Sequence, residues 1–276
     1  MAIKFLPLLF FLSALSVDAQ EIKVMTYNIK YDDINDTVNN WNDRKDAMVR
    51  LLQKEQPSFI GLQEALLRQL TYLDEALPDY RYIGVGRDDG KQKGEFSPIL
   101  YDDSRYHMLR SNTFWLSRTP EKVSVGWDAA LERICTYGLF ENKQTMEKLW
   151  VFNTHFDHVG TKARKKSVRL IVKKIKEVNS QNLPVVFMGD LNLTPDQKPI
   201  EYLQTKMDDG LLISENPMKG PSGTFNGFDS PAPINRRIDY IFVKDLAVST
   251  YLHLDERLEN RKHISDHLPV IALLEK

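Results

Sequence analysis

Cysteine is almost missing from this chain, which has 276 residues and a single cysteine, Cys135. One cysteine cannot form a disulfide within the chain, so the fold must be stabilised by its hydrophobic core. We expect Cys135 to be a small buried residue, because nothing around it in the sequence would activate a nucleophilic thiol. Hydrophobic residues make up 42% of the chain and charged residues 27%. This balance is typical of a globular protein with a sizeable core.

An excess of charge is also missing, since the formal net charge is −1. Proteins that bind nucleic acid nonspecifically usually carry a basic surplus, because they displace counterions from the phosphate backbone. The sequence therefore disfavours polymeric DNA or RNA as the substrate, without excluding a local basic cleft. Basic residues gather over residues 162–176, opposite the apolar side of a predicted helix. We interpret them as a solvated helix face, with nucleic-acid contact as the alternative.

Long hydrophobic runs are confined to the beginning of the sequence. Lys4 precedes an apolar stretch over residues 5–17, and the small residue Ala19 stands just before Gln20. This pattern predicts a signal peptide over residues 1–19. A membrane anchor is the alternative, but the stretch is shorter than the ~20 residues that span a bilayer. We therefore expect an exported protein, periplasmic or secreted, without stable membrane insertion.

Repeats, low-complexity runs and linkers are absent from the sequence, so we expect one domain over residues 20–276, and a monomer. The apolar patterning predicts strands over residues 21–29, 58–62, 80–85, 98–101, 133–140, 149–156, 184–188, 238–243 and 268–274. It predicts helices over residues 43–56, 66–77 and 162–178. A β-rich middle follows residue 101, and a long loop precedes residue 238. Strands and helices in two successive halves indicate an α/β sandwich, with two packed mixed sheets flanked by helices.

Several predicted strands end in polar side chains. Carboxylate, amide and imidazole groups stand at or near these ends, at Asn28, Glu64, His155, Asp157, Asp190, Asn192, Asp239, Asp266 and His267. Each alone is typical of a turn or cap, but strand ends also hold functional groups rigidly. The set is rich in oxygen and lacks cysteine, which favours Mg²⁺ or Mn²⁺ over structural Zn²⁺. A zinc hydrolase would need a histidine pair at helical spacing, whereas His155 and His158 lie in a strand-to-loop segment.

The motifs that contain these residues resemble, in the same order, those of the endonuclease/exonuclease/phosphatase superfamily. They are Thr26-Tyr27-Asn28-Ile29, Gln63-Glu64, Asn153-Thr154-His155-Phe156-Asp157, Gly189-Asp190-Leu191-Asn192, Arg237-Ile238-Asp239-Tyr240 and Ser265-Asp266-His267-Leu268-Pro269. The resemblance covers essentially all of residues 20–276. It is specific for the superfamily, which includes deoxyribonucleases, abasic-site endonucleases and the deadenylase–nocturnin group, but not for a substrate. It implies a four-layer α/β sandwich with the site at one edge, and Mg²⁺ as the cofactor, for which Mn²⁺ can substitute.

The resemblance also implies where the metal binds. Glu64 would be the main ligand, with Asn28 and Asp266 close to the ion. A cation there would neutralise the charge of a phosphoester, which otherwise repels hydroxide. Some nucleases of the superfamily carry an acid two residues after the Asn28 position, whereas this chain has Lys30. The first strand therefore adds no second carboxylate, and we expect one principal metal ion rather than two.

Five residues receive catalytic roles from the same resemblance. Asp190 would orient and deprotonate the attacking water, helped by Asn192, and His155 would bind a phosphate oxygen. His267 would stabilise the charge that develops on the pentacovalent transition state, and Asp239 would hold His267. The chemistry of the residues agrees, because an imidazole paired with a carboxylate stays protonated near neutral pH.

Three further residues are candidates for substrate binding. Arg133 opens a predicted strand, and its guanidinium suits a bidentate contact to phosphate, with a surface ion pair as the alternative. Asp157 follows His155 by two residues and should face the same side, where it would bind substrate or orient a histidine. Phe225 would stack on a base or sugar, or else seal its loop against the domain. Arg237, just before Asp239, could equally be structural.

The predicted function is an exported, Mg²⁺-dependent phosphoester hydrolase, either a phosphodiesterase or nuclease or a phosphatase. Its substrate, a nucleic-acid fragment, a nucleotide, or a sugar or lipid phosphate, stays open. A sphingomyelinase-like activity on a lipid or sugar phosphodiester is one alternative. A non-catalytic binding module of the same fold is another, but such a module should have lost Glu64, Asp190 or His267, and all three are present.

Overall fold

Two six-stranded mixed sheets form the centre of the protein, of which the computed structural model describes residues 21–229 and 231–276. The predicted signal peptide, residues 1–19, lies outside the described residues. The first sheet has the order β11 (Ala247–His253), β12 (Val270–Glu275), β1 (Ile22–Asn28), β2 (Phe59–Gln63), β4 (Ile99–Asp102), β3 (Tyr80–Ile83). The second has the order β5 (Tyr106–Trp115), β6 (Ile134–Asn142), β7 (Lys148–His155), β8 (Val185–Asp190), β10 (Asp239–Lys244), β9 (Asp208–Asp209).

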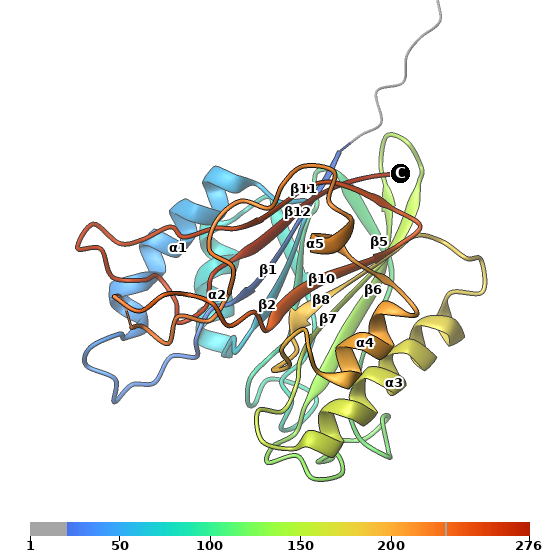
Figure 1. Ribbon diagram of the computed structural model, residues 1–276, viewed down its shortest axis with the longest axis horizontal. Helices are drawn as coiled ribbons and strands as arrows, with labels where there is room; N and C mark the ends of the chain where they lie inside the picture. The colour runs from blue at the N-terminus through green and yellow to red at the C-terminus, as the bar shows by residue number, and fades with distance from the viewer. Residues whose placement is uncertain (1–20, 230) are drawn as a thin grey trace, which may run out of the picture.

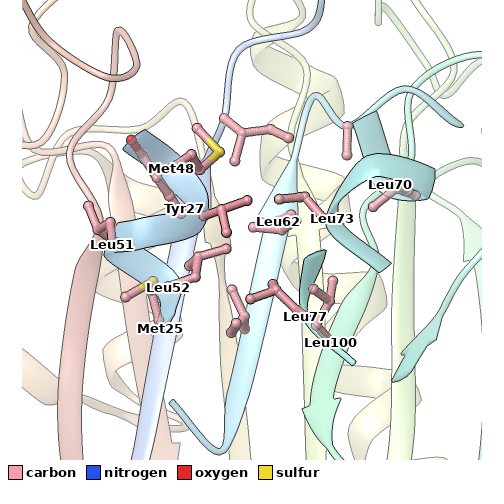
Figure 2. Packing of buried hydrophobic residues seen from close by; sticks show 14 of the residues in the cluster. Met25, Tyr27, Met48, Leu51, Leu52, Leu62, Leu70, Leu73, Leu77 and Leu100 are labelled. Carbon is pink, nitrogen blue, oxygen red and sulfur yellow. The ribbon is translucent and has the colours of Figure 1, made fainter. Parts of the chain in front are cut away.

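Helices cover the outer face of each sheet, which completes the four layers that the sequence predicted (Figure 1). α1 (Trp41–Glu55) and α2 (Leu67–Ala76) pack on the first sheet, and α3 (Thr161–Val178) and α4 (Lys198–Gln204) pack on the second. Figure 2 shows Met48 and Leu52 of α1 and Leu73 of α2 directed onto β1 and β2. The apolar stripe of each helix therefore faces a sheet, as expected for amphipathic helices. Among the described residues, no helix combines the length and the apolar character needed to span a bilayer.

The ends of α1 follow from local sequence. Asn40 caps the first turn, since its side-chain oxygen accepts a hydrogen bond from the backbone N–H of Asp43 at 3.2 Å. At the other end, Gln56 adopts a left-handed conformation with φ of 47°, and Pro57 follows it. Proline has no backbone N–H to continue the helix and disfavours helical geometry in the residue before it. The chain is thereby turned directly into β2.

Strand direction brings the polar strand ends to one edge of the sandwich. β1 and β2 are parallel, with Asn28 opposite Gln63, and β7 and β8 are parallel, with His155 opposite Asp190. β10 runs antiparallel to β8, so its first residue, Asp239, also pairs with Asp190. β12 is likewise antiparallel to β1, which places the segment before β12 at the same edge. The carboxyl ends of four strands and the amino ends of two others therefore meet.

A buried polar residue joins the two sheets behind this edge. Asn153 of β7 is fully buried, and its Nδ2 donates to the backbone oxygens of Leu62 and Pro98, both at 2.7 Å. Its Oδ1 accepts from Gln63 Nε2, also at 2.7 Å. Gly61 provides the room, because a Cβ there would lie 2.7 Å from the Asn153 side chain. Both the NH₂ group and the oxygen of the Asn153 amide are hydrogen-bonded, so burying this side chain costs little free energy.

The elements for which the sequence prediction gave no bounds lie in its β-rich middle, in its long loop and after residue 243. β5 falls in the middle segment, and α4, β9 and the short α5 (Gly210–Ile213) fall in the loop before residue 238. β11 falls between the predicted strands over residues 238–243 and 268–274, where no element was predicted. It is a strand at the sheet edge with a register shift between Val248 and Thr250, and four of its seven residues are at least partly exposed. Its polar residues and bulge therefore hide the apolar pattern of a core strand.

Candidate active site

A cavity of about 640 Å³ opens at the edge where the strand ends meet. Most of the predicted site residues line it: Glu64, Arg133, His155, Asp190, Asn192, Phe225, Asp266 and His267. Three others, Asn28, Asp157 and Asp239, are buried and contact those lining residues instead. The structure thus brings the predicted residues together from both sheets.

Three residues at the cavity have unusual backbone conformations. Lys30, Glu64 and Asn192 have φ values of 56°, 59° and 48°, in the left-handed region that residues other than glycine rarely adopt. Each directly follows, or lies two residues after, a strand end. Such conformations cost free energy and are concentrated at functional sites.

His267 lies between two acids. Its Nδ1 is 2.9 Å from Asp239 Oδ2, and its Nε2 is 3.7 Å from Asp190 Oδ2. Asp239 is fixed in turn by Thr224, whose Oγ1 donates to Asp239 Oδ2 at 2.5 Å. Burial of the ring disfavours its charged form, but the carboxylates of Asp239 and Asp190 outweigh burial and raise the pKa of His267 to about 10. The imidazole is therefore a cationic donor that faces the cavity with Nε2.

Asp190 is held at the end of β8 by amide groups. Its Oδ1 accepts from the backbone N–H of Asn192 at 2.9 Å, and its Oδ2 accepts from Asn28 Nδ2 at 3.1 Å. Burial raises the pKa of Asp190, and the nearby charge of Asp239 raises it further, to about 7. A carboxylate with a pKa near neutrality can take up and release a proton at physiological pH, as a general base must.

His155 is neutral, unlike His267. Burial lowers its pKa well below the usual value, and the charges of Arg133 and Arg87 act in the same direction. Its Nε2 lies 3.2 Å from Asn192 Nδ2 and 3.4 Å from Asp190 Oδ2. Its Nδ1 is 3.9 Å from a carboxylate oxygen of Glu95. Because burial makes the ring neutral, it offers one donor and one acceptor to the cavity region.

Glu64 and Asp266 converge on one cationic group. Lys30 Nζ lies 3.4 Å from Glu64 Oε2 and 3.7 Å from Asp266 Oδ2. Asn28 Nδ2 donates to Glu64 Oε1 at 3.1 Å, while Asn28 Oδ1 accepts from the Lys30 N–H. Burial works against ionisation of Glu64, but the charges of Lys30 and His267 together with hydrogen bonds from Asn28 and the Tyr31 N–H outweigh it, and the pKa of Glu64 is lowered. Burial raises the pKa of Asp266.

A second group of possible metal ligands lies beside this pair. Asp190, Asp239 and His267 are buried and place one ligand atom each within 4.8 Å of one another, so they could hold a metal ion. The Nδ1 of His267 is already used by Asp239, however. Oxygen-rich sets of this kind suit hard cations such as Mg²⁺.

The three residues predicted to bind substrate have different surroundings. Arg133 lines the cavity and is 5% exposed, with Nη2 3.0 Å from His158 Nδ1. Phe225 also lines it, with its ring edge-on to His267 at a centroid distance of 5.1 Å. Asp157 is 2% exposed, and its carboxylate accepts from the backbone N–H groups of residues 130, 159 and 160. Asp157 thus holds the loops around Arg133, and Arg133 Nε lies 3.5 Å from Asp157 Oδ2.

Some residues at the cavity were not among the sequence candidates. Glu95 and Arg236 line it, and Arg87 pairs with Glu95 at 2.8 Å. These residues come from loops, so no strand end marked them in the sequence. Arg237 proves structural, because it forms a buried ion pair with Asp209 on β9. Cys135 is fully buried with a pKa raised well above the usual value by burial, as expected for an unreactive core thiol.

The model of the Endonuclease/Exonuclease/phosphatase family matches residues 25–267. The chain belongs to this family. Its members are hydrolases that act on phosphoesters and depend on divalent metals, so the prediction of a phosphoester hydrolase is confirmed at this level.

Similar proteins include two solved structures from Bacteroides thetaiotaomicron. One is a protein of the same family, 36% identical, with a TM-score of 0.89, and the match covers 93% of this chain and 95% of that one. The other is a mannosyl-6-phosphatase, also 36% identical with a TM-score of 0.89, and the match covers 92% of this chain and 100% of that one. An uncharacterised protein of Acanthamoeba polyphaga mimivirus is 26% identical over 263 residues, which are 87% of this chain and 94% of the viral protein.

Proposed function

We propose that this chain is a Mg²⁺-dependent phosphatase that removes a phosphate group from a phosphorylated sugar. The observation that carries the proposal is the cationic His267 between Asp239 and Asp190, next to the converging acids Glu64 and Asp266. The choice of a sugar phosphate is supported by the similar protein named a mannosyl-6-phosphatase. The polar lining of the cavity also favours a hydrophilic substrate.

Glu64 and Asp266 are the residues that fit the metal best. Their carboxylates already converge on one cation, the Lys30 ammonium, at 3.4 and 3.7 Å. Asn28 orients Glu64 through its hydrogen bond at 3.1 Å. Bound there, Mg²⁺ supplies charge neutralisation of the phosphate and of the oxygen that leaves. Lys30 itself also lines the cavity and adds a positive charge to it.

The protein's own residues account for the proton transfers. Asp190 accepts the proton of the attacking water, for which its pKa of about 7 is suitable. His267 keeps its proton and donates a hydrogen bond from Nε2 to the charge that develops on phosphorus-bound oxygen. Asn192 Nδ2 and His155 Nε2 line the cavity 3.2 Å apart, and they would give up this mutual contact to donate hydrogen bonds to the remaining phosphate oxygens.

A substrate panel tests the proposal on purified residues 20–276. We expect phosphate release from mannose 6-phosphate with Mg²⁺ or Mn²⁺, loss of this activity with EDTA, and slower cleavage of bis-p-nitrophenyl phosphate. RNA, single-stranded DNA and sphingomyelin belong in the same panel. Faster cleavage of any of these than of the sugar phosphate would refute the proposed substrate class while leaving the hydrolase assignment intact.

We also propose that the protein is exported and monomeric. The sequence of residues 1–19 supports export, and mass spectrometry of the secreted or periplasmic product tests it, since cleavage near Gln20 gives a defined mass. Light scattering of the purified protein tests the monomer. A full-length product retained in the cytoplasm would contradict the first proposal, and a dimer mass the second.

A further inference from the structure

A second group of charged residues lines the cavity beside His155. It consists of Glu95 and Arg133, with His158 next to Arg133 and Arg87 next to Glu95. None of these residues is needed for the proton transfers proposed above. Glu95, Arg133 and His158 share the cavity with the reaction centre, so they are within reach of a substrate bound there.

Arg133 is buried with unused hydrogen-bonding capacity. It is 5% exposed, and its Nη2 pairs with His158 Nδ1 at 3.0 Å while its Nε lies 3.5 Å from Asp157 Oδ2. Its Nη1 makes no hydrogen bond to any of the described residues. A buried guanidinium that leaves a donor unpaired is costly in a folded protein, and such groups are usually completed by water or a ligand.

Glu95 offers an acceptor to the same region. Its side chain is 17% exposed, and its Oε2 accepts from Arg87 Nη1 at 2.8 Å. Its Oε1 accepts no hydrogen bond from residues 21–229 or 231–276. The loop that carries Glu95 is fixed, since the backbone N–H of Arg87 donates to the backbone carbonyl oxygen of Glu95 at 3.1 Å. Gly94 packs so closely on Asp88 that a Cβ there would clash with the carboxylate.

A carboxylate in this position is informative because the substrate is an anion. Glu95 repels phosphate, so it does not recognise the phosphate group itself. A carboxylate oxygen and a guanidinium N–H that both lack hydrogen bonds to the described part of the chain, on two residues that line the same cavity, instead complement hydroxyl groups, which donate to the first and accept from the second. Hydroxyl groups on adjacent carbons of a sugar ring provide a donor for the carboxylate and an acceptor for the guanidinium at the same time.

We propose that Glu95 and Arg133 form a subsite that binds the hydroxyl groups of the sugar whose phosphate is removed. The inference rests on the proposed function, because it assigns a role to the uncharged part of the same substrate. It makes Glu95 a specificity-determining residue. The competing role is purely structural: Glu95 would only close its loop onto Arg87.

Two phosphate monoesters separate these roles, mannose 6-phosphate and n-hexyl phosphate. Both release a primary alcohol, so their chemistry is matched, and only the first carries ring hydroxyls. We expect Glu95→Gln to lower the ratio of their kcat/KM values, mannose 6-phosphate over n-hexyl phosphate, by about 10- to 100-fold. Arg133→Met should lower the same ratio. Lys91→Gln, a change of an exposed residue in the same loop, should leave it unchanged. An unchanged ratio in Glu95→Gln, with both substrates affected equally, would overturn the subsite.

A binding measurement keeps the test independent of turnover. In the Asp190→Asn background, calorimetry should show tighter binding of mannose 6-phosphate than of n-hexyl phosphate, and Glu95→Gln should remove this difference. If the difference is found but neither ester is hydrolysed by the unaltered protein, the subsite stands and the proposed phosphatase function fails. If both esters are hydrolysed and bound with equal affinity, the function stands and the subsite fails.

Discussion

Asp239 and Asp190 approach the same imidazole from opposite nitrogens: Asp239 Oδ2 is 2.9 Å from His267 Nδ1, and Asp190 Oδ2 is 3.7 Å from His267 Nε2. The shorter contact is a hydrogen bond that fixes the ring, and the longer one leaves Nε2 available to a reacting group. The two acids are therefore not equivalent, although they lie opposite each other in the register of β8 and β10.

Replacing Asp239 by Asn should slow the chemical step. The amide cannot stabilise the imidazolium, so His267 loses its charge and its fixed orientation. We expect kcat to fall by roughly 10²- to 10⁴-fold, with a much smaller change in KM. Steady-state kinetics on the sugar phosphate give both constants. A Thr224→Val variant serves as a milder comparison, because it leaves the Asp239 carboxylate in place and removes the Thr224 hydroxyl that binds this carboxylate and the backbone N–H groups of Ile238 and Asp239. An unaltered kcat in Asp239→Asn would contradict the role of the pair.

The value of kcat/KM should first rise and then fall as the pH is increased. Asp190 must be deprotonated to act as a base, so kcat/KM should rise with pH through about 7, the pKa of Asp190. His267 must be protonated to donate, so kcat/KM should fall as pH passes about 10, the pKa of His267. A pH profile measured with a constant, saturating Mg²⁺ concentration checks both limbs. Asp190→Asn should abolish the acid limb, and its survival in that variant would assign it to another group.

Glu64→Gln should weaken metal binding. The change removes one of the two carboxylates that converge on Lys30 Nζ and leaves the size of the side chain unaltered. We expect the Kd for Mg²⁺ or Mn²⁺, measured by calorimetry, to rise roughly 10-fold or more. Glu75→Gln, an exposed change on α2, is the matched control. Equal metal affinity in Glu64→Gln and the control protein would place the ion elsewhere, with the Asp190–Asp239–His267 group as the next candidate.

Asp157→Asn should destabilise the fold in a pH-dependent way. Burial opposes ionisation of Asp157, but three backbone N–H groups and Arg133 outweigh it, so its pKa is lowered in the folded state. The stability it contributes is therefore present above the unfolded-state pKa of about 4 and is lost as pH falls through the folded-state value. We expect a loss of about 2 kcal/mol in unfolding free energy at pH 7 and a smaller difference below pH 4, by urea denaturation. A difference that stays constant down to pH 3 would mean that packing, not charge, is the cause.

The strand ends explain why so much of the site could be predicted from the sequence. Glu64, His155 and Asp190 follow short apolar runs, so the pattern that predicts each strand also marks where it ends. Glu95 and Thr224 lie in loops, and their position depends on contacts with Arg87 and Asp239 that no local pattern encodes.

The same distinction holds for the fold. The amphipathic α3 and the apolar β8 were predicted almost to their ends, because burial imposes a clear periodicity on both. The seven-residue α4 and the bulged edge strand β11 were missed. Short elements contribute few apolar positions, and an edge strand is covered on fewer sides, so tertiary contacts decide their structure.

Asn153 has a consequence for how this enzyme is assembled. Metal-ligand candidates such as Glu64 follow strands of one sheet, whereas Asp190 and His155 end strands of the other, and the amide of Asn153 crosses between the two close behind them. Neither sheet can therefore form a competent site alone, and the first sheet itself needs strands from both ends of the chain. Turnover becomes a direct report on whether the two sheets have docked, and partly folded chains with one sheet formed should be inactive rather than weakly active.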